Sequence, residues 1–314
     1  MVRFQTYIWG ILLCSSIGCA PYALHTQPDW ESRPESIKIH NVPAYAQDTH
    51  QCGATALASA LCWSEVQTSP EELESQVYDP KRKGTLQNSL ISAARRQGRV
   101  GFQIRGPHAL QKELQAGHPV LVLLNQGLTW WPVWHYAVVC GYEGPNQKII
   151  IAGGKPSKEK ISWSIFHRMW LRADEWGLLV LPPDDLPATA SAQKWVRAVH
   201  GLELAGQYEQ AFTGYAAALP KWPFDLATMM GMANSLYALD RLQEAEDILR
   251  QAVKMHPEAG PAFNNLAQVL LEQGRIQAAH QAINTALELG GPYIESFQET
   301  RTAIRNREKS GHTP

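Results

Sequence analysis

A repeat of 34 residues runs through the C-terminal part of the sequence. Two columns of alanine follow this period: Ala211, Ala245 and Ala279, and Ala218, Ala252 and Ala286. Large apolar residues follow it too: Trp195, Met229 and Phe263, and Tyr215, Leu249 and Ile283. Turn-forming residues fill one further column: Gly206, Asp240 and Gly274. Small residues where two helices cross, with a tight turn between the helices, predict an all-α solenoid of helix pairs.

These columns resemble the tetratricopeptide repeat, in three copies over residues 192–291. Residues 292–314 are expected to add a tail and the capping helix that such arrays need. The resemblance implies that the array binds a protein partner, often a peptide, in a concave groove. The alternative is that the repeats only brace the preceding domain.

The N-terminus has the pattern of an export signal. A basic Met-Val-Arg start is followed by an apolar stretch from about Tyr7 to Leu13 and then by small residues up to Gly18. The alternative is a buried N-terminal helix or strand. Residues 1–18 are therefore expected to be a signal peptide, and the polar residues 19–36 a tether to the first domain.

The end of this segment resembles a bacterial lipoprotein signal. In that family the cysteine after a small residue is acylated, which corresponds here to Cys19 after Gly18. Ser16 departs from the pattern, because the family usually has leucine at that position. Ala20 follows the cysteine in place of the aspartate that signals inner-membrane retention. The resemblance implies a lipid-anchored protein of the bacterial cell envelope, in the outer membrane and facing the periplasm.

The segment Pro182 to Pro187 has the composition of a linker, which we place at residues 184–191, so that the first domain covers residues 37–183. Helical patterns come first in this domain, over residues 52–62, from Ser69 onward as a capping box, and over residues 86–97. Apolar runs typical of strands come later: residues 101–105, 120–124, 135–142, 148–152 and 177–181. This order predicts an α+β fold.

Cys52 begins the first of these helices and is followed by Gly53. A helix start directs unpaired amides and the positive end of the helix dipole at this thiol, which favours the nucleophilic thiolate. Gln47 lies five residues earlier, so its side-chain amide and the amide of Cys52 can together stabilise an oxyanion. His135 opens an apolar strand about 80 residues later and is a candidate general base. The alternative is that the cysteine and the histidine are only structural.

At these residues the first domain resembles the papain-like cysteine peptidases, and among them the bacteriocin-processing, double-glycine peptidases. The matching pieces are Val42-Pro43, Gln47, Cys52-Gly53, Gly117-His118-Pro119-Val120, His135-Tyr136 and Gly141-Tyr142. The resemblance implies Cys52 as nucleophile, His135 as base and Gln47 as oxyanion donor.

The chain departs from this family at the residue that orients the histidine. The family has an aspartate or asparagine on the strand after the histidine strand, where this chain reads Ile149 to Lys155 without a carboxylate or side-chain amide. A backbone carbonyl, a water or Ser157 are alternatives for this role, and weak or lost activity is another.

Trp130, Trp131 and Trp134 surround Pro132 just before the histidine and are candidates for a substrate groove, with a packed loop as the alternative. The basic run from Lys81 to Lys83 is expected to be a solvated loop.

No metal motif and no phosphate-binding glycine loop is present, so we expect no metal and no cofactor. A net charge of -1 gives no indication of nucleic-acid binding. We therefore expect a thiol-dependent peptidase acting on an envelope peptide or protein. The rivals are a non-catalytic peptide-binding adaptor and an amidase or transpeptidase that uses the same thiol.

Overall fold

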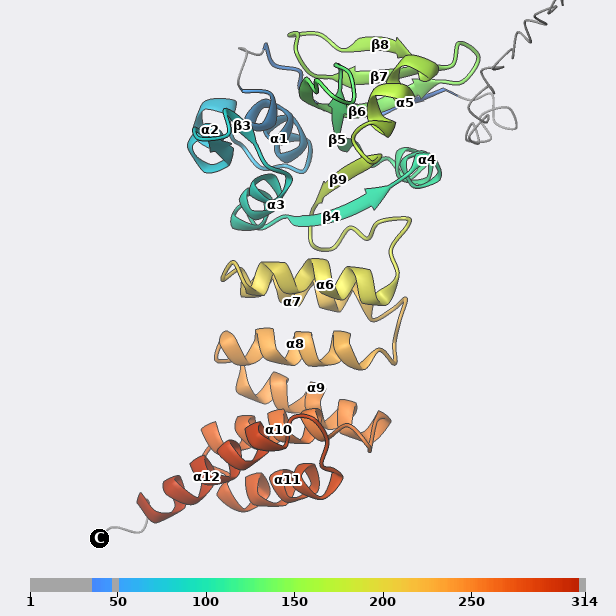
Figure 1. The fold of residues 1–314 in the computed structure, drawn as a ribbon. Helices are drawn as coiled ribbons and strands as arrows, with labels where there is room; N and C mark the ends of the chain where they lie inside the picture. Colours follow the sequence, from blue (N-terminus) through green and yellow to red (C-terminus); the bar gives the residue numbers. More distant parts are fainter. Residues whose placement is uncertain (1–35, 47–50, 311–314) are drawn as a thin grey trace, which may run out of the picture.

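The computed structural model describes residues 36–46 and 51–310, and Figure 1 shows two parts stacked along the chain. The first part is built on an antiparallel sheet in the order β4-β9-β5-β6-β7-β8, with β1 paired to β6. Its strands are β1 (Ile37–Lys38), β4 (Val100–Arg105), β5 (Val120–Asn125), β6 (Trp134–Glu143), β7 (Lys148–Ala152), β8 (Glu159–Ser162) and β9 (Trp176–Leu181). A separate hairpin consists of β2 (Tyr78–Asp79) and β3 (Gly84–Thr85). The second part is helical, so the predicted α+β domain followed by an all-α solenoid is confirmed.

The helices of the first part are α1 (Cys52–Trp63), α2 (Pro70–Val77), α3 (Gln87–Arg96), α4 (Pro107–Gln115) and α5 (Trp163–Leu171). Helix α2 starts at the predicted capping box, where Ser69 and Glu72 exchange hydrogen bonds. The strand predictions agree with β4, β5, β6, β7 and β9 to within one residue at each end. Strand β8 and helix α5 were not predicted.

The repeats form the helices α6 (Ala192–Glu203), α7 (Tyr208–Ala218), α8 (Leu226–Ala238), α9 (Leu242–Met255), α10 (Gly260–Glu272), α11 (Ile276–Leu289) and α12 (Ile294–Ser310). All six alanines of the two columns are completely buried. Gly206, Asp240 and Gly274, at the turn inside each pair, have φ angles of 74°, 58° and 74°. This left-handed conformation explains the choice of glycine, and aspartate is one of the few other residues that adopt it.

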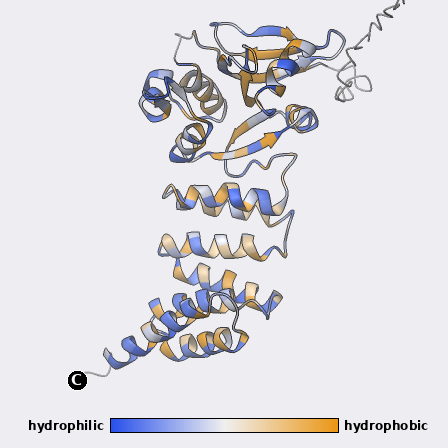
Figure 2. Ribbon diagram, in the orientation of Figure 1, coloured by the Kyte–Doolittle hydropathy of each residue, from blue (hydrophilic) through white to orange (hydrophobic). Residues whose placement is uncertain are grey.

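The two parts share one hydrophobic core. Trp195 of α6 is fully buried together with residues of the sheet, and its ring lies 6.4 Å from that of Phe102 on β4. Its indole N–H donates to the carbonyl of Gly214 in α7. Figure 2 shows apolar residues in the strands and alternating apolar and polar residues along the repeat helices. The first helix pair is therefore part of the support of the first domain.

The connection between the two parts is held by buried polar contacts. The Glu113 carboxylate accepts hydrogen bonds from the backbone N–H groups of Ala188 and Thr189. It also bonds Nδ1 of His118 at 2.7 Å, and Nε2 of the same ring bonds Asp185 at 3.2 Å. The segment predicted as a linker is thus fixed to α4. Among the described residues, no helix is long and apolar enough to span a membrane.

Candidate active site

Cys52 is the first residue of α1, as predicted, and its thiol is partly buried and unpaired. No acidic residue lies in the first turn of the helix, so the helix dipole at the thiol is not opposed there. The preceding residue, Gln51, is held by a 2.9 Å hydrogen bond from its side-chain amide to Glu74 of α2. Gln47 and Cys19 lie outside the described residues, and so do the predicted signal peptide and most of the tether.

Gly53 is glycine because Thr85 of β3 packs directly against it. A Cβ atom at this position would lie 2.4 to 2.6 Å from the side-chain atoms of Thr85. The carbonyl of Thr85 accepts a 3.1 Å hydrogen bond from the Tyr136 hydroxyl on β6. Burial, together with the charge of the nearby Cys52, raises the pKa of Tyr136 well above its usual range. Helix α1, the β2–β3 hairpin and β6 are therefore fastened to one another beside the thiol.

A cleft of about 550 Å³ opens at Cys52. It is lined by Cys52, Arg82, Lys83, Gly84, Thr85, Leu86, Gln87, Leu123, Trp134 and Tyr136. Arg82 and Lys83 come from the turn of the hairpin, so the sequence-based expectation of a solvated loop was incomplete: both side chains are exposed, and both border the cleft. The sequence did contain a signal for them, in the run of three basic residues.

His135 is the second residue of β6 and is not among the residues that line the cleft. Its imidazole lies 3.9 to 4.0 Å from the position that a Cβ atom would occupy on Gly154. In the described part of the chain it forms no hydrogen bond with the Cys52 thiol. Burial lowers the pKa of His135, and the negative charge of Glu159 partly opposes this effect. The imidazole is therefore mainly neutral at pH 7.

Strand β7, next to the His135 strand, ends at Ala152 and is followed by Gly153 and Gly154, so none of these three positions offers a carboxylate or side-chain amide to the imidazole. Ser157 is exposed and forms no hydrogen bond with His135 within residues 36–46 and 51–310. The carboxylate whose charge raises the pKa of His135 is that of Glu159, at the start of the next strand, β8.

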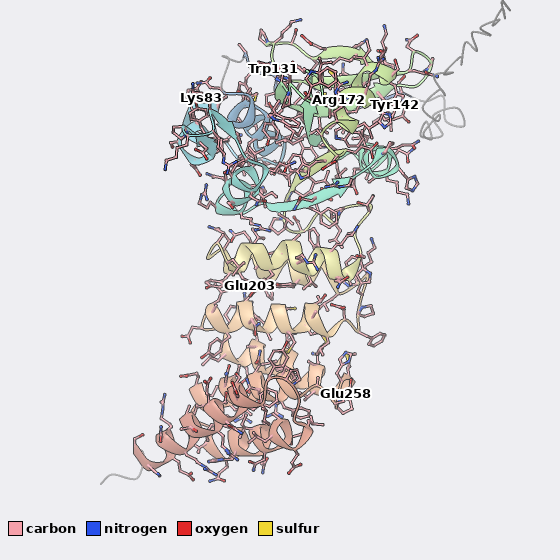
Figure 3. All side chains as sticks on the ribbon, in the orientation of Figure 1. Lys83, Trp131, Tyr142, Arg172, Glu203 and Glu258 are labelled. Atoms are coloured by element: carbon pink, nitrogen blue, oxygen red, sulfur yellow. The ribbon has the colours of Figure 1, made fainter. Side chains whose placement is uncertain are left out.

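The turn between β5 and β6 displays the candidate tryptophans. Trp134 lines the cleft, whereas Trp130 and Trp131 are 79% and 75% exposed at the tip of the turn. Buried Asn125 fixes the turn, since its side-chain oxygen accepts from the backbone N–H groups of Gly127 and Val133. Figure 3 shows Lys83 and Trp131 in the upper part of the first domain. Only Trp134 of the three is therefore part of the cleft itself.

The other described cysteines are placed away from this chemistry. The thiol of Cys62 lies 3.4 Å from the Tyr45 hydroxyl, and buried Cys140 contacts the carbonyl of Ile150 at 3.6 Å. Neither is in a disulfide. Among residues 36–46 and 51–310, no three His, Cys, Asp or Glu side chains are grouped so as to hold a metal ion.

Comparison with known families agrees with this geometry. Residues 39–175 match the peptidase C39 like family, and residues 230–293 match the tetratricopeptide repeat. The first domain is thus a peptidase C39-like domain, and the helical part contains tetratricopeptide repeats. The predicted resemblances to this peptidase group and to the repeat are confirmed to that extent.

Similar individual proteins cover one part of the chain or the other. Tetratricopeptide repeat protein 7B of Homo sapiens and of Mus musculus is 32% identical over 136 residues, and the match spans 40% of this chain but 16% of those relatives. The peptidase domain of Streptococcus ComA is 24% identical, with a TM-score of 0.39. The aligned part is 45% of this chain and 98% of the ComA domain. The Yersinia enterocolitica secretion chaperone SycD is 16% identical, with a TM-score of 0.36, over 38% of this chain and 86% of SycD.

Proposed function

We propose that the first domain is a thiol-dependent peptidase that acts on a peptide or protein of the bacterial cell envelope. The observation that carries the proposal is the position of Cys52: a free thiol at the start of a helix, in a cleft, in a domain that matches a peptidase family. The unpaired amides at the helix start and the side chains of Arg82 and Lys83, which line the same cleft, are positioned beside this thiol.

In this proposal the Cys52 thiolate attacks the scissile carbonyl carbon, and the carbonyl oxygen becomes an oxyanion. The amide of Cys52 and the side chain of Gln47 stabilise that oxyanion. His135, which has taken the proton of the Cys52 thiol before the attack, passes it to the leaving amine, and breakage of the C–N bond releases the first product and leaves a thioester. Water then hydrolyses the thioester. Cys52 and His135 form no hydrogen bond in the described part of the chain, and catalytic hydrogen bonds often tighten only in the complex with substrate.

The first test is alkylation of the protein by an iodoacetamide probe across pH, with and without His135→Ala. Rapid labelling of Cys52 below pH 7, slowed by the histidine change, is the expected result. Cys62→Ala is a matched control, because it removes a second partly buried thiol from the same helix. Peptide cleavage is expected to disappear in Cys52→Ala and to persist in Cys62→Ala. Cleavage that survives Cys52→Ala would contradict the proposal.

A second function, a non-catalytic peptide-binding adaptor, is favoured by one observation. Within residues 36–46 and 51–310, no aspartate or asparagine forms a hydrogen bond with His135, and a histidine without its orienting partner can lose on the order of 10⁴ in rate. The adaptor predicts that peptides bind normally and that no thioester forms with any thiol-directed peptide probe. Mass spectrometry of the protein after exposure to such a probe separates the two functions.

We further propose that the protein is lipid-anchored through Cys19 and that the repeats recruit the substrate or a partner. Incorporation of a labelled fatty acid, lost in Cys19→Ala, tests the anchor. For the repeats, truncation before α6 would remove Trp195 from the shared core, so the cut belongs after α7. Loss of α8 to α12 is expected to reduce turnover of the natural substrate and to spare a short synthetic peptide.

A further inference from the structure

We infer that the cleft at Cys52 selects peptides that carry both an acidic side chain and a large apolar or aromatic side chain close to the scissile bond. The inference rests on the proposed function and names its substrate class. It is drawn from two groups of residues that line the cleft together with Cys52 and differ in chemistry.

The first wall is basic and comes from the turn of the β2–β3 hairpin. Arg82 and Lys83 line the cleft, and no aspartate or glutamate is among its lining residues in the described part of the chain. Asp79 pairs with Arg82 at 3.6 Å, while Lys83 has no ion-pair partner among the described residues. The wall therefore presents an unbalanced positive charge to whatever enters, and this charge favours a carboxylate.

This basic wall is held in a fixed position. The Asp79 carboxylate accepts hydrogen bonds from the backbone N–H groups of Lys81 and Arg82, which closes the turn. Lys83 has a φ of 50°, a conformation that is costly for a residue other than glycine and that persists only where the surroundings enforce it. Thr85, two residues on, packs against Gly53. The backbone that carries the two cations is therefore held in place relative to the helix start at Cys52.

The second wall is apolar. It consists of Trp134 and Leu123 from β6 and β5, with Leu86 at the end of the hairpin. Trp134 remains 51% exposed and Leu86 42% exposed, so both offer apolar surface that a ligand can cover. Because Asn125 fixes the turn that precedes Trp134, binding a ligand here requires little ordering of the protein. An apolar or aromatic side chain of the substrate would cover this exposed surface.

The test uses peptides that differ at one residue. Each peptide contains an acidic residue on one side of the cleavage site and a leucine or phenylalanine on the other. Both orders are made. Each peptide is compared with the same peptide in which glutamine or lysine replaces the acidic residue. We expect kcat/KM for the preferred order to fall about tenfold for glutamine and further for lysine, since reversing a charge beside a cation disfavours binding. Equal rates for the three peptides would overturn the inference.

Variants of the basic turn give a matched comparison. Lys83→Glu is expected to remove the preference for the acidic peptide. Lys81→Glu makes the same charge change in the same turn, but Lys81 does not line the cleft, so the preference should remain. If both variants abolish the preference equally, the preference comes from the overall charge of the surface and not from the cleft, and the inference fails.

Binding to the Cys52→Ala protein separates this inference from the proposed function. Fluorescence anisotropy of the labelled peptides measures affinity without cleavage, so discrimination there supports the inference even if the enzyme proves inactive. Trp134→Ala should weaken binding of the peptide with the large apolar residue and leave an alanine-containing peptide unchanged. If Trp134→Ala instead weakens binding to phospholipid vesicles and has no effect on peptides, the apolar wall contacts lipid and the inference is overturned.

Discussion

The pH dependence of stability should reveal the buried histidine that joins the two parts of the chain. The side chain of His118 is 7% exposed, and that of Glu113 is 0% exposed. Burial alone would lower the pKa of His118, but hydrogen bonds to Asp185 and Glu113, and their charges, outweigh it and raise the pKa from 6.5 to about 9. At 1.36 kcal/mol per pH unit, this difference corresponds to roughly 3 kcal/mol of folding free energy.

The direction follows from the protonated state that the fold favours. Because the pKa of His118 is higher in the folded than in the unfolded protein, its contribution is complete below about pH 6.5 and is lost as pH rises to about 9. For Glu113, burial would raise the pKa, but hydrogen bonds from His118 and Thr189 lower it overall, so its contribution is lost only as pH falls through the acid range. Between about pH 6.5 and 9, the pH dependence of this buried pair therefore comes from His118 and not from Glu113.

The assay is urea unfolding, followed by tryptophan fluorescence at intervals from pH 6 to pH 10. At pH 6, His118→Gln leaves the buried Glu113 carboxylate without its cation and is expected to cost about 3–5 kcal/mol. The difference from wild type should shrink as pH rises past 9. His280→Gln is the control, since it breaks a histidine–carboxylate pair with Glu308 that is far more exposed. If the wild-type and His118→Gln curves run parallel across the range, the charged pair contributes nothing and the reasoning is refuted.

Two further predictions concern the histidine environment and the repeats. Glu159→Gln should lower the pKa of His135 further, because it removes the negative charge that raises it. Lys155→Met should raise the pKa of His135, because Lys155 pairs with Glu159 at 2.6 Å and partly neutralises that charge. NMR titration of the imidazole measures both pKa shifts, and shifts of the same sign would contradict the assignment. Gly231→Ala should destabilise the protein by about 1–3 kcal/mol, because the new Cβ atom would lie 2.3 to 2.7 Å from the ring of buried Tyr215. Urea unfolding measures this loss. An unchanged urea midpoint would show that the ring moves aside freely.

The parts of the fold that follow a local period could be predicted from the sequence. The 34-residue columns gave the helix pairs, because each position in a solenoid repeats the same packing. Helix α5 was missed although Trp163, Phe166 and Trp170 are spaced as on one face of a helix and are buried. Ser162 precedes it without a capping hydrogen bond, so its start had no signal of the kind that marked α2.

The candidate site was predictable in part. Cys52 could be assigned to a helix start, since the alanine-rich run after it shows the helix directly. The partners of the thiol could not be found in this way. Thr85 reaches Gly53 from a different element, and Tyr136 reaches Thr85 from a strand that follows 51 residues later. No period or motif connects such positions, because only the folded chain brings them together.

The same reason explains why the sequence did not indicate that the basic run, although exposed as expected, also borders the cleft, and why the two parts cannot be treated as independent. A charge beside a turn is normally solvated, and Lys81 remains so. Lys83, two residues later in the same turn, borders the cleft, because the contact between Thr85 and Gly53 holds the turn beside Cys52. Likewise, Trp195 satisfies the repeat pattern and also packs on the sheet through Phe102. The first repeat therefore belongs energetically to the first domain.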